Sequence, residues 1–117
     1  MRKLCLLSLL LLTCYQSTAS AHAVVTDYSL KIAPIKANKD DKVTLNFNSK
    51  IEIGLSQVFL VSTGDQLTPL TIANGEKQGQ MVVNIPALTP GDYALKLKVF
   101  AADGHLTEDV IHFKITP

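Results

Sequence analysis

The chain has 117 residues, of which 47% are apolar and 18% charged, and its formal net charge is +1. This composition predicts one small globular domain. The near-neutral charge excludes the strongly basic surface on which nucleic-acid binding depends, and it offers no attraction to anionic membranes.

Residues 1–21 have the pattern of a secretory signal peptide. A positively charged start precedes the apolar run 4–12, and Ala-Ser-Ala at 19–21 forms a small-x-small cleavage site. The apolar run is too short to span a bilayer, which needs about 20 apolar residues. We therefore expect cleavage after Ala21 and a secreted mature domain, residues 22–117, without a transmembrane segment.

Both cysteines lie within this leader, at Cys5 and Cys14. The mature segment therefore has no disulfide and no thiolate ligand, which excludes a blue-copper site. One alternative stays open, because residues 11–14 weakly resemble a lipoprotein box in which Cys14 would be lipidated. Thr13 departs from the small residue usual before such a cysteine, and lipidation there would leave His22 inside the chain.

Alternating apolar and polar residues predict short strands through the mature segment. The predicted strands lie, in chain order, near 24–31, at 43–47 and 58–61, near 67–72, and at 81–85, 93–99 and 111–115. Turn-forming residues separate them, and no helix longer than one turn is expected, with a single irregular turn at 51–55. The pattern predicts an all-β Greek-key sandwich or barrel of about seven strands. Residues 88–93, Leu-Thr-Pro-Gly-Asp-Tyr, further predict a tyrosine corner.

Three residues of the mature segment suggest a metal site. Cleavage after Ala21 would make His22 the terminal residue, so its α-amine and imidazole Nδ1 could chelate one ion, and the amine loses its proton readily near neutral pH. Asp103 and His105 flank Gly104 after the longest predicted strand, where a tight turn could bring both side chains together. Such a nitrogen-rich, thiol-free set with one carboxylate suits tetragonal Cu(II) better than Zn(II).

These residues resemble the bacterial periplasmic copper-resistance protein C family, the CopC-like domains. The resemblance is strongest at His22-Ala23, at 43–48, at 88–93 and at 102–105, Ala-Asp-Gly-His. It implies a cupredoxin-like or Ig-like Greek-key sandwich. It also implies a single Cu(II) ion per chain, held by the mature N-terminal histidine and the Asp-Gly-His segment.

The resemblance implies a periplasmic copper carrier or buffer in copper resistance or homeostasis, not an enzyme. Its partners would be copper and either an inner-membrane copper transporter or other periplasmic copper proteins. Two alternatives remain: a metal-free Ig-like adhesion or assembly module, and a small oxidative copper enzyme with a terminal histidine. Asp103 also has an alternative role, since it could cap backbone amides in an Asx-turn without touching a metal.

Overall fold

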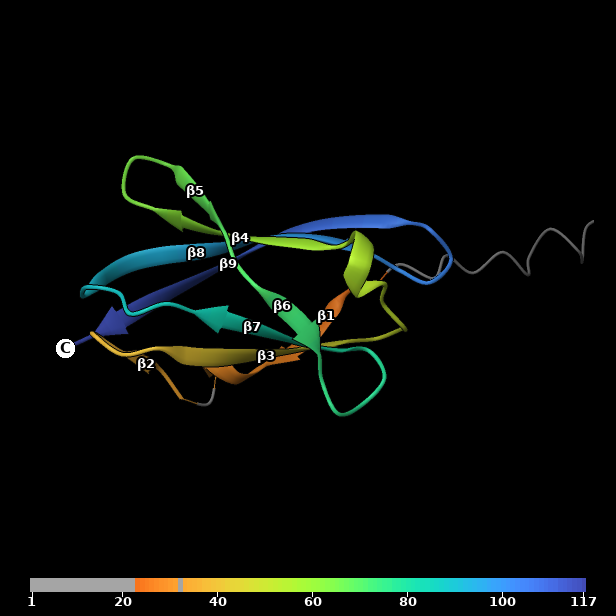
Figure 1. Cartoon of the computed structure of the whole chain (residues 1–117), viewed down its shortest axis with the longest axis horizontal. Helices are drawn as coiled ribbons and strands as arrows, with labels where there is room; N and C mark the ends of the chain where they lie inside the picture. The colour runs from red at the N-terminus through yellow and green to blue at the C-terminus, as the bar shows by residue number, and fades with distance from the viewer. Residues whose placement is uncertain (1–22, 32) are drawn as a thin grey trace, which may run out of the picture.

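The computed structural model describes residues 23–31 and 33–117, which form two facing β-sheets (Figure 1). The four-stranded sheet has the order β1 (Val25–Tyr28), β3 (Asp41–Phe47), β7 (Gln80–Ile85), β6 (Ile72–Asn74). The five-stranded sheet has the order β2 (Ile35–Lys36), β9 (Leu106–Thr116), β8 (Gly91–Phe100), β4 (Gln57–Ser62), β5 (Gln66–Pro69). Neighbouring strands are antiparallel except β2 and β9, and two short 3-10 turns complete the elements, η2 (Ser29–Lys31) and η3 (Ile53–Leu55). None of the helical turns in these residues is long and apolar enough to cross a membrane.

The predicted all-β sandwich is confirmed, and the barrel alternative is wrong, because the two sheets of the described chain stay separate. The chain enters the five-stranded sheet at β2 and returns to the four-stranded sheet at β3, and it crosses again between β3 and β4, between β5 and β6, and between β7 and β8. The strand number exceeds the predicted seven or so, since the described residues contain nine strands. The two-residue strand β2 is too short to give an alternating pattern.

The predicted strand at 67–72 is divided between the two sheets as β5 and β6. The backbone N–H of Leu70 still donates to Val58 of the five-stranded sheet, at 2.9 Å. The carbonyl of the next residue, Thr71, already accepts from Asn84 of the four-stranded sheet, at 3.0 Å. The chain therefore changes sheets between two consecutive residues, and an alternating sequence pattern carries no information about that change.

Alternation along the strands builds one apolar core between the sheets. Its fully buried side chains include Val43, Leu45, Met81, Val83, Leu95, Leu97 and Val99. Burying one such side chain stabilises the fold by about 1.5–3 kcal/mol. The core thus fixes β8 and β9 firmly, and with them the turn that joins these two strands.

The tyrosine corner predicted from residues 88–93 is confirmed. The hydroxyl of Tyr93 donates to the carbonyl oxygen of Thr89 at 2.9 Å, and the Tyr93 ring stacks on Phe113 with centroids 5.9 Å apart. This corner anchors the start of β8. Figure 1 shows that the chain ends at the same side, whereas the β8–β9 turn, η3 and the start of β1 lie at the opposite end of the sandwich.

Candidate metal centre

The β8–β9 turn carries the Asp-Gly-His segment. The last pair of the ladder is Phe100 with Leu106, and the N–H of Gly104 closes a tight turn by donating to the carbonyl of Ala101 at 2.9 Å. Gly104 has φ of +91°, a conformation that other residues adopt only with strain. The sequence prediction that Gly104 permits a tight turn here is therefore confirmed.

This turn brings Asp103 and His105 into contact. Oδ2 of Asp103 lies 2.9 Å from Nδ1 of His105, and Oδ1 accepts the backbone N–H of His105 at 3.1 Å. The second contact is the Asx-turn foreseen as an alternative role for Asp103. The two roles do not compete, because one carboxylate oxygen shapes the turn while the other faces the imidazole.

The contact also shifts the titration of the carboxyl group. The side-chain hydrogen bond from His105, and then the backbone N–H of the same residue, hold the pKa of Asp103 below its usual value of 3.8. Both side chains are open to solvent, with exposed fractions of 58% for His105 and 37% for Asp103. The pair is therefore accessible to an ion from outside, and its carboxylate is charged at neutral pH.

The spacing of the two donor atoms suits a metal ion. Two ligands about 2.0 Å from one ion, at right angles, lie about 2.8 Å apart. The 2.9 Å between Oδ2 and Nδ1 is close to that value, so the distance allows both atoms to bind one ion once the imidazole turns its Nδ1 towards it. Alternatively, Asp103 could hold the Nδ1–H of His105 while Nε2 binds the ion, an arrangement common in metal sites.

A neighbouring loop buttresses the turn. The N–H of Ala102 donates to the carbonyl of Lys50 at 3.0 Å, and the N–H of Glu52 donates to the carbonyl of Phe100 at 2.8 Å. Ile51 and Ala101 form an isolated antiparallel bridge between these bonds, and both side chains are buried. The start of the turn is therefore fixed to the loop at residues 50–52, in addition to its pairing within the β8–β9 ladder.

The amino-terminal arm, defined as Ala23 and Val24, reaches the same end of the sandwich. Ala23 is completely buried, and it lines a small cavity together with Val99 and Thr107. Those two residues are register partners, one pair inward from the end of the β8–β9 ladder. The arm is thus packed against the base of the turn that carries Asp103 and His105.

His22, the third predicted ligand, lies outside the described residues. Within residues 23–31 and 33–117, no group of three or more His, Cys, Asp or Glu side chains is arranged to hold a metal ion. The described residues therefore supply two of the predicted ligands, Asp103 and His105. A site with more ligands would need donor atoms from outside the described residues. The assignment of His22, Asp103 and His105 as ligands stays a prediction.

Sequence reasoning missed the residue that holds the arm. The side-chain Oδ1 of Asn48 accepts the N–H of Val24 at 2.9 Å, and the backbone N–H of Asn48 donates to the carbonyl of Val24 at 3.1 Å. Asn48 follows directly after β3, and an asparagine at this position is typical of a residue that simply ends a strand. No local pattern indicates a partner that lies 24 residues away in the sequence.

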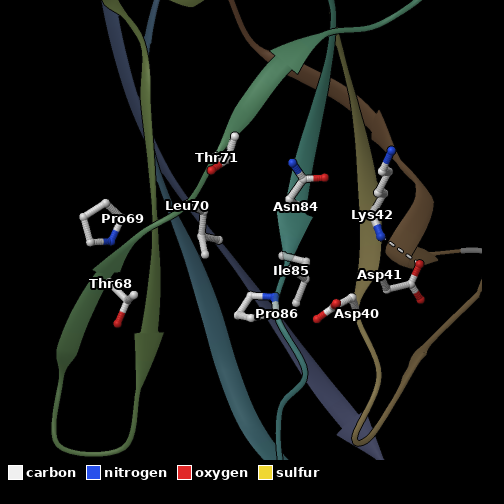
Figure 2. A pocket seen from close by; sticks show the side chains of 10 residues that line it. All are labelled: Asp40, Asp41, Lys42, Thr68, Pro69, Leu70, Thr71, Asn84, Ile85 and Pro86. Carbon is white, nitrogen blue, oxygen red and sulfur yellow. Dashed lines mark hydrogen bonds between the residues drawn. The ribbon is translucent and has the colours of Figure 1, made fainter.

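A larger cavity, of about 610 Å³, lies elsewhere on the described surface (Figure 2). It opens beside the crossing from β5 to β6, between Leu70 on one side and Ile85 and Pro86 on the other. Its two carboxylates already accept backbone N–H groups, Asp40 from Ala87 at 3.0 Å and Asp41 from Lys42 at 2.8 Å. The lining includes no residue of the β8–β9 turn, so this cavity is separate from the candidate metal centre.

The sequence matches the CopC domain over residues 31–116. Because this match spans most of the chain, the protein belongs to the CopC domain family, and the resemblance inferred from the sequence is confirmed. The matched residues include Asp103 and His105 but begin after His22. A search of curated proteins gave no significant match.

Solved structures share the fold. The chain is similar to CopC from Methylosinus trichosporium OB3b, with a TM-score of 0.69 and 23% identity, over 82% of this chain and 95% of that one. It is also similar to PcoC, a methionine-rich copper resistance protein from Escherichia coli, with a TM-score of 0.61 and 21% identity, over 82% of this chain and 100% of that one. At these identities the likeness establishes a CopC-like β-sandwich.

Proposed function

We propose that the mature protein begins at His22 and binds one Cu(II) ion. The ligands are the α-amine and imidazole of His22 and the imidazole of His105, with Asp103 either bound directly or orienting His105. The protein acts in the periplasm as a copper carrier or buffer in copper resistance. Membership of the CopC family and likeness to a copper resistance protein support this proposal.

The observation that carries the proposal is the burial of Ala23 beside the β8–β9 turn. Ala23 is completely buried and shares a cavity with Thr107, two residues after His105. His22 is joined to Ala23 by one peptide bond, and consecutive Cα atoms are about 3.8 Å apart. A terminal residue attached to Ala23 would begin beside the base of the β8–β9 turn, which supports its assignment as a ligand together with His105.

The donor set favours Cu(II) over other ions. Three nitrogens and a carboxylate suit a tetragonal site, and Cu(II) stands above its divalent neighbours in affinity for such ligands. A thioether site for Cu(I) has little support, because Met81 is the one methionine after the leader and its side chain is completely buried. In this respect the chain differs from PcoC, which is methionine-rich.

A carrier role follows from the openness of the site. His105 is more than half exposed, so a bound ion could be taken up and released at the surface without opening the fold. The same exposure leaves the ion without the water-excluding walls on which catalytic sites depend. We therefore propose that the protein transports or stores copper and performs no bond chemistry.

The test is a Cu(II) titration of exported protein against a competing chelator. The natural protein should bind one equivalent tightly, and His105→Ala should weaken binding by at least 100-fold. His112→Ala is the matched control, since His112 is an exposed histidine of β9, paired with Ala94 away from the turn. No tight site in the natural protein, or equal loss in both variants, would contradict the proposal.

A further inference from the structure

The arm is held by a contact that the regular strand pairing does not provide. The register of β1 with β3 is irregular between Val25 and Asp27, and the strand pair ends at Val25 with Phe47. Beyond that point the backbone of Val24 is bonded at both its N–H and its carbonyl to one residue, Asn48. Asn48 thus extends the edge of the sheet by one residue, towards the chain's amino terminus.

We infer that Asn48 is a positioning residue for the copper site, an inference that rests on the function proposed above. By fixing Val24 it keeps Ala23 in its buried position beside Thr107. It thereby holds the attachment point of the terminal residue near Asp103 and His105. Asn48 acts through the arm and is not itself a copper ligand.

The size of the effect follows from the exposure of the contact. Asn48 is exposed, and a solvent-accessible hydrogen bond contributes a modest net stabilisation to the arrangement it holds. Asn48→Ala removes the side-chain acceptor and leaves the backbone bond to Val24 intact. The arm is then in its bound position in a smaller fraction of the molecules. The apparent Cu(II) affinity is proportional to that fraction, so we expect it to fall roughly two- to tenfold.

Three features separate positioning from a general loss of stability. Asn48→Ala should increase amide hydrogen exchange at Val24 while exchange in the middle of β8 stays unchanged. Asn48→Asp keeps an acceptor oxygen at the same place and should bind Cu(II) at least as tightly as the natural protein. Asn84→Ala is the control, because it makes the same chemical change on an exposed residue of β7, away from the arm.

The decisive experiment combines Asn48→Ala with a block of the terminal amine. Full-length chains with and without Gly-Ser inserted between Ala21 and His22 are exported, processed and titrated with Cu(II). We expect Asn48→Ala to weaken binding two- to tenfold in the natural chain and clearly less in the inserted chain, in which the amine of His22 is an amide and only its imidazole is left as a ligand from the arm.

The outcomes distinguish the two ideas. If the insertion weakens binding but Asn48→Ala does not, the positioning inference is wrong and the proposed ligand set stands. If the insertion leaves the affinity unchanged, the α-amine is not a ligand, and both the proposed ligand set and this inference fail. Equal weakening by Asn48→Ala in both chains would show a general effect on the fold and would also overturn the inference.

Discussion

Asp103 contacts His105 at two points, through Oδ1 to the backbone N–H at 3.1 Å and through Oδ2 to the ring Nδ1 at 2.9 Å. A single carboxylate therefore sets both the shape of the turn and the orientation of the imidazole. Because a ligand with a fixed ring orientation loses less entropy on binding, this contact would favour ion binding at the proposed copper site.

Replacing Asp103 tests that relationship through pH. The contact with His105 lowers the pKa of Asp103, so the ionised carboxylate stabilises the fold. That stabilisation is complete above the usual pKa of 3.8 and is lost as the pH falls through the lowered value. Copper-free Asp103→Asn protein should unfold at a lower temperature than the natural protein at neutral pH, and the difference should shrink in acid.

The pH effect has its own control. In a His105→Ala background the side-chain contact is already absent, so adding Asp103→Asn should change the pH dependence of the melting temperature much less. In the otherwise natural chain, Asp103→Asn should also weaken Cu(II) binding by roughly 10- to 100-fold. An unchanged affinity would show that the charged carboxylate of Asp103 is not a ligand.

Gly104→Ala tests the geometry of the turn. A Cβ at Gly104 would meet no atom within 4 Å, so the whole effect comes from its φ of +91°. We expect a loss of about 1 kcal/mol in the free energy of unfolding, measured by chemical denaturation, and weaker Cu(II) binding. Gly54→Ala, which also enters open space, should leave both quantities nearly unchanged.

Thr107→Val tests a buried hydroxyl near the candidate site. Over the described part of the chain, Oγ1 of Thr107 is buried without a hydrogen-bond partner. An unsatisfied buried hydroxyl costs about 1–3 kcal/mol, and valine has nearly the same shape. The melting temperature of the copper-free protein should therefore rise by several degrees.

The comparison for Thr107 is Thr26→Val. The hydroxyl of Thr26 donates to the carbonyl of Asn46 at 3.2 Å, so its removal should not stabilise the protein. A lower melting temperature for Thr107→Val would mean that its hydroxyl has a stabilising contact in solution.

Tyr93→Phe tests the anchor at the far end of β8. The hydroxyl of Tyr93 donates to Thr89 at 2.9 Å, and its loss should destabilise the protein by about 1 kcal/mol. Because this corner lies at the opposite end of the sandwich from the β8–β9 turn, Cu(II) affinity should stay within twofold of the natural value (Figure 1). A large loss of affinity would show coupling along β8.

The sequence predicts most of the sandwich because alternation reports which side chains enter the core. Val43 and Leu45 of β3, and Leu95 and Leu97 of β8, are buried as their spacing requires. Alternation does not report which sheet a strand joins, so the division of 67–72 into β5 and β6 could not be foreseen.

The candidate site shows the same limit. The contact of Asp103 with His105 is local, and the intervening Gly104 makes it predictable from three consecutive residues. The contact of Asn48 with Val24 depends on how β1 meets β3, and the sequence around either residue does not indicate it. Local turn chemistry was therefore predictable, and the support of the arm was not.

The most direct test of the copper assignment is the EPR spectrum of exported protein loaded with one equivalent of Cu(II). We predict a tetragonal signal with superhyperfine coupling to nitrogens of both His22 and His105, and a clear change of the signal when Gly-Ser precedes His22. A spectrum that is identical with and without this extension would contradict the account, because copper would then not touch the terminal amine.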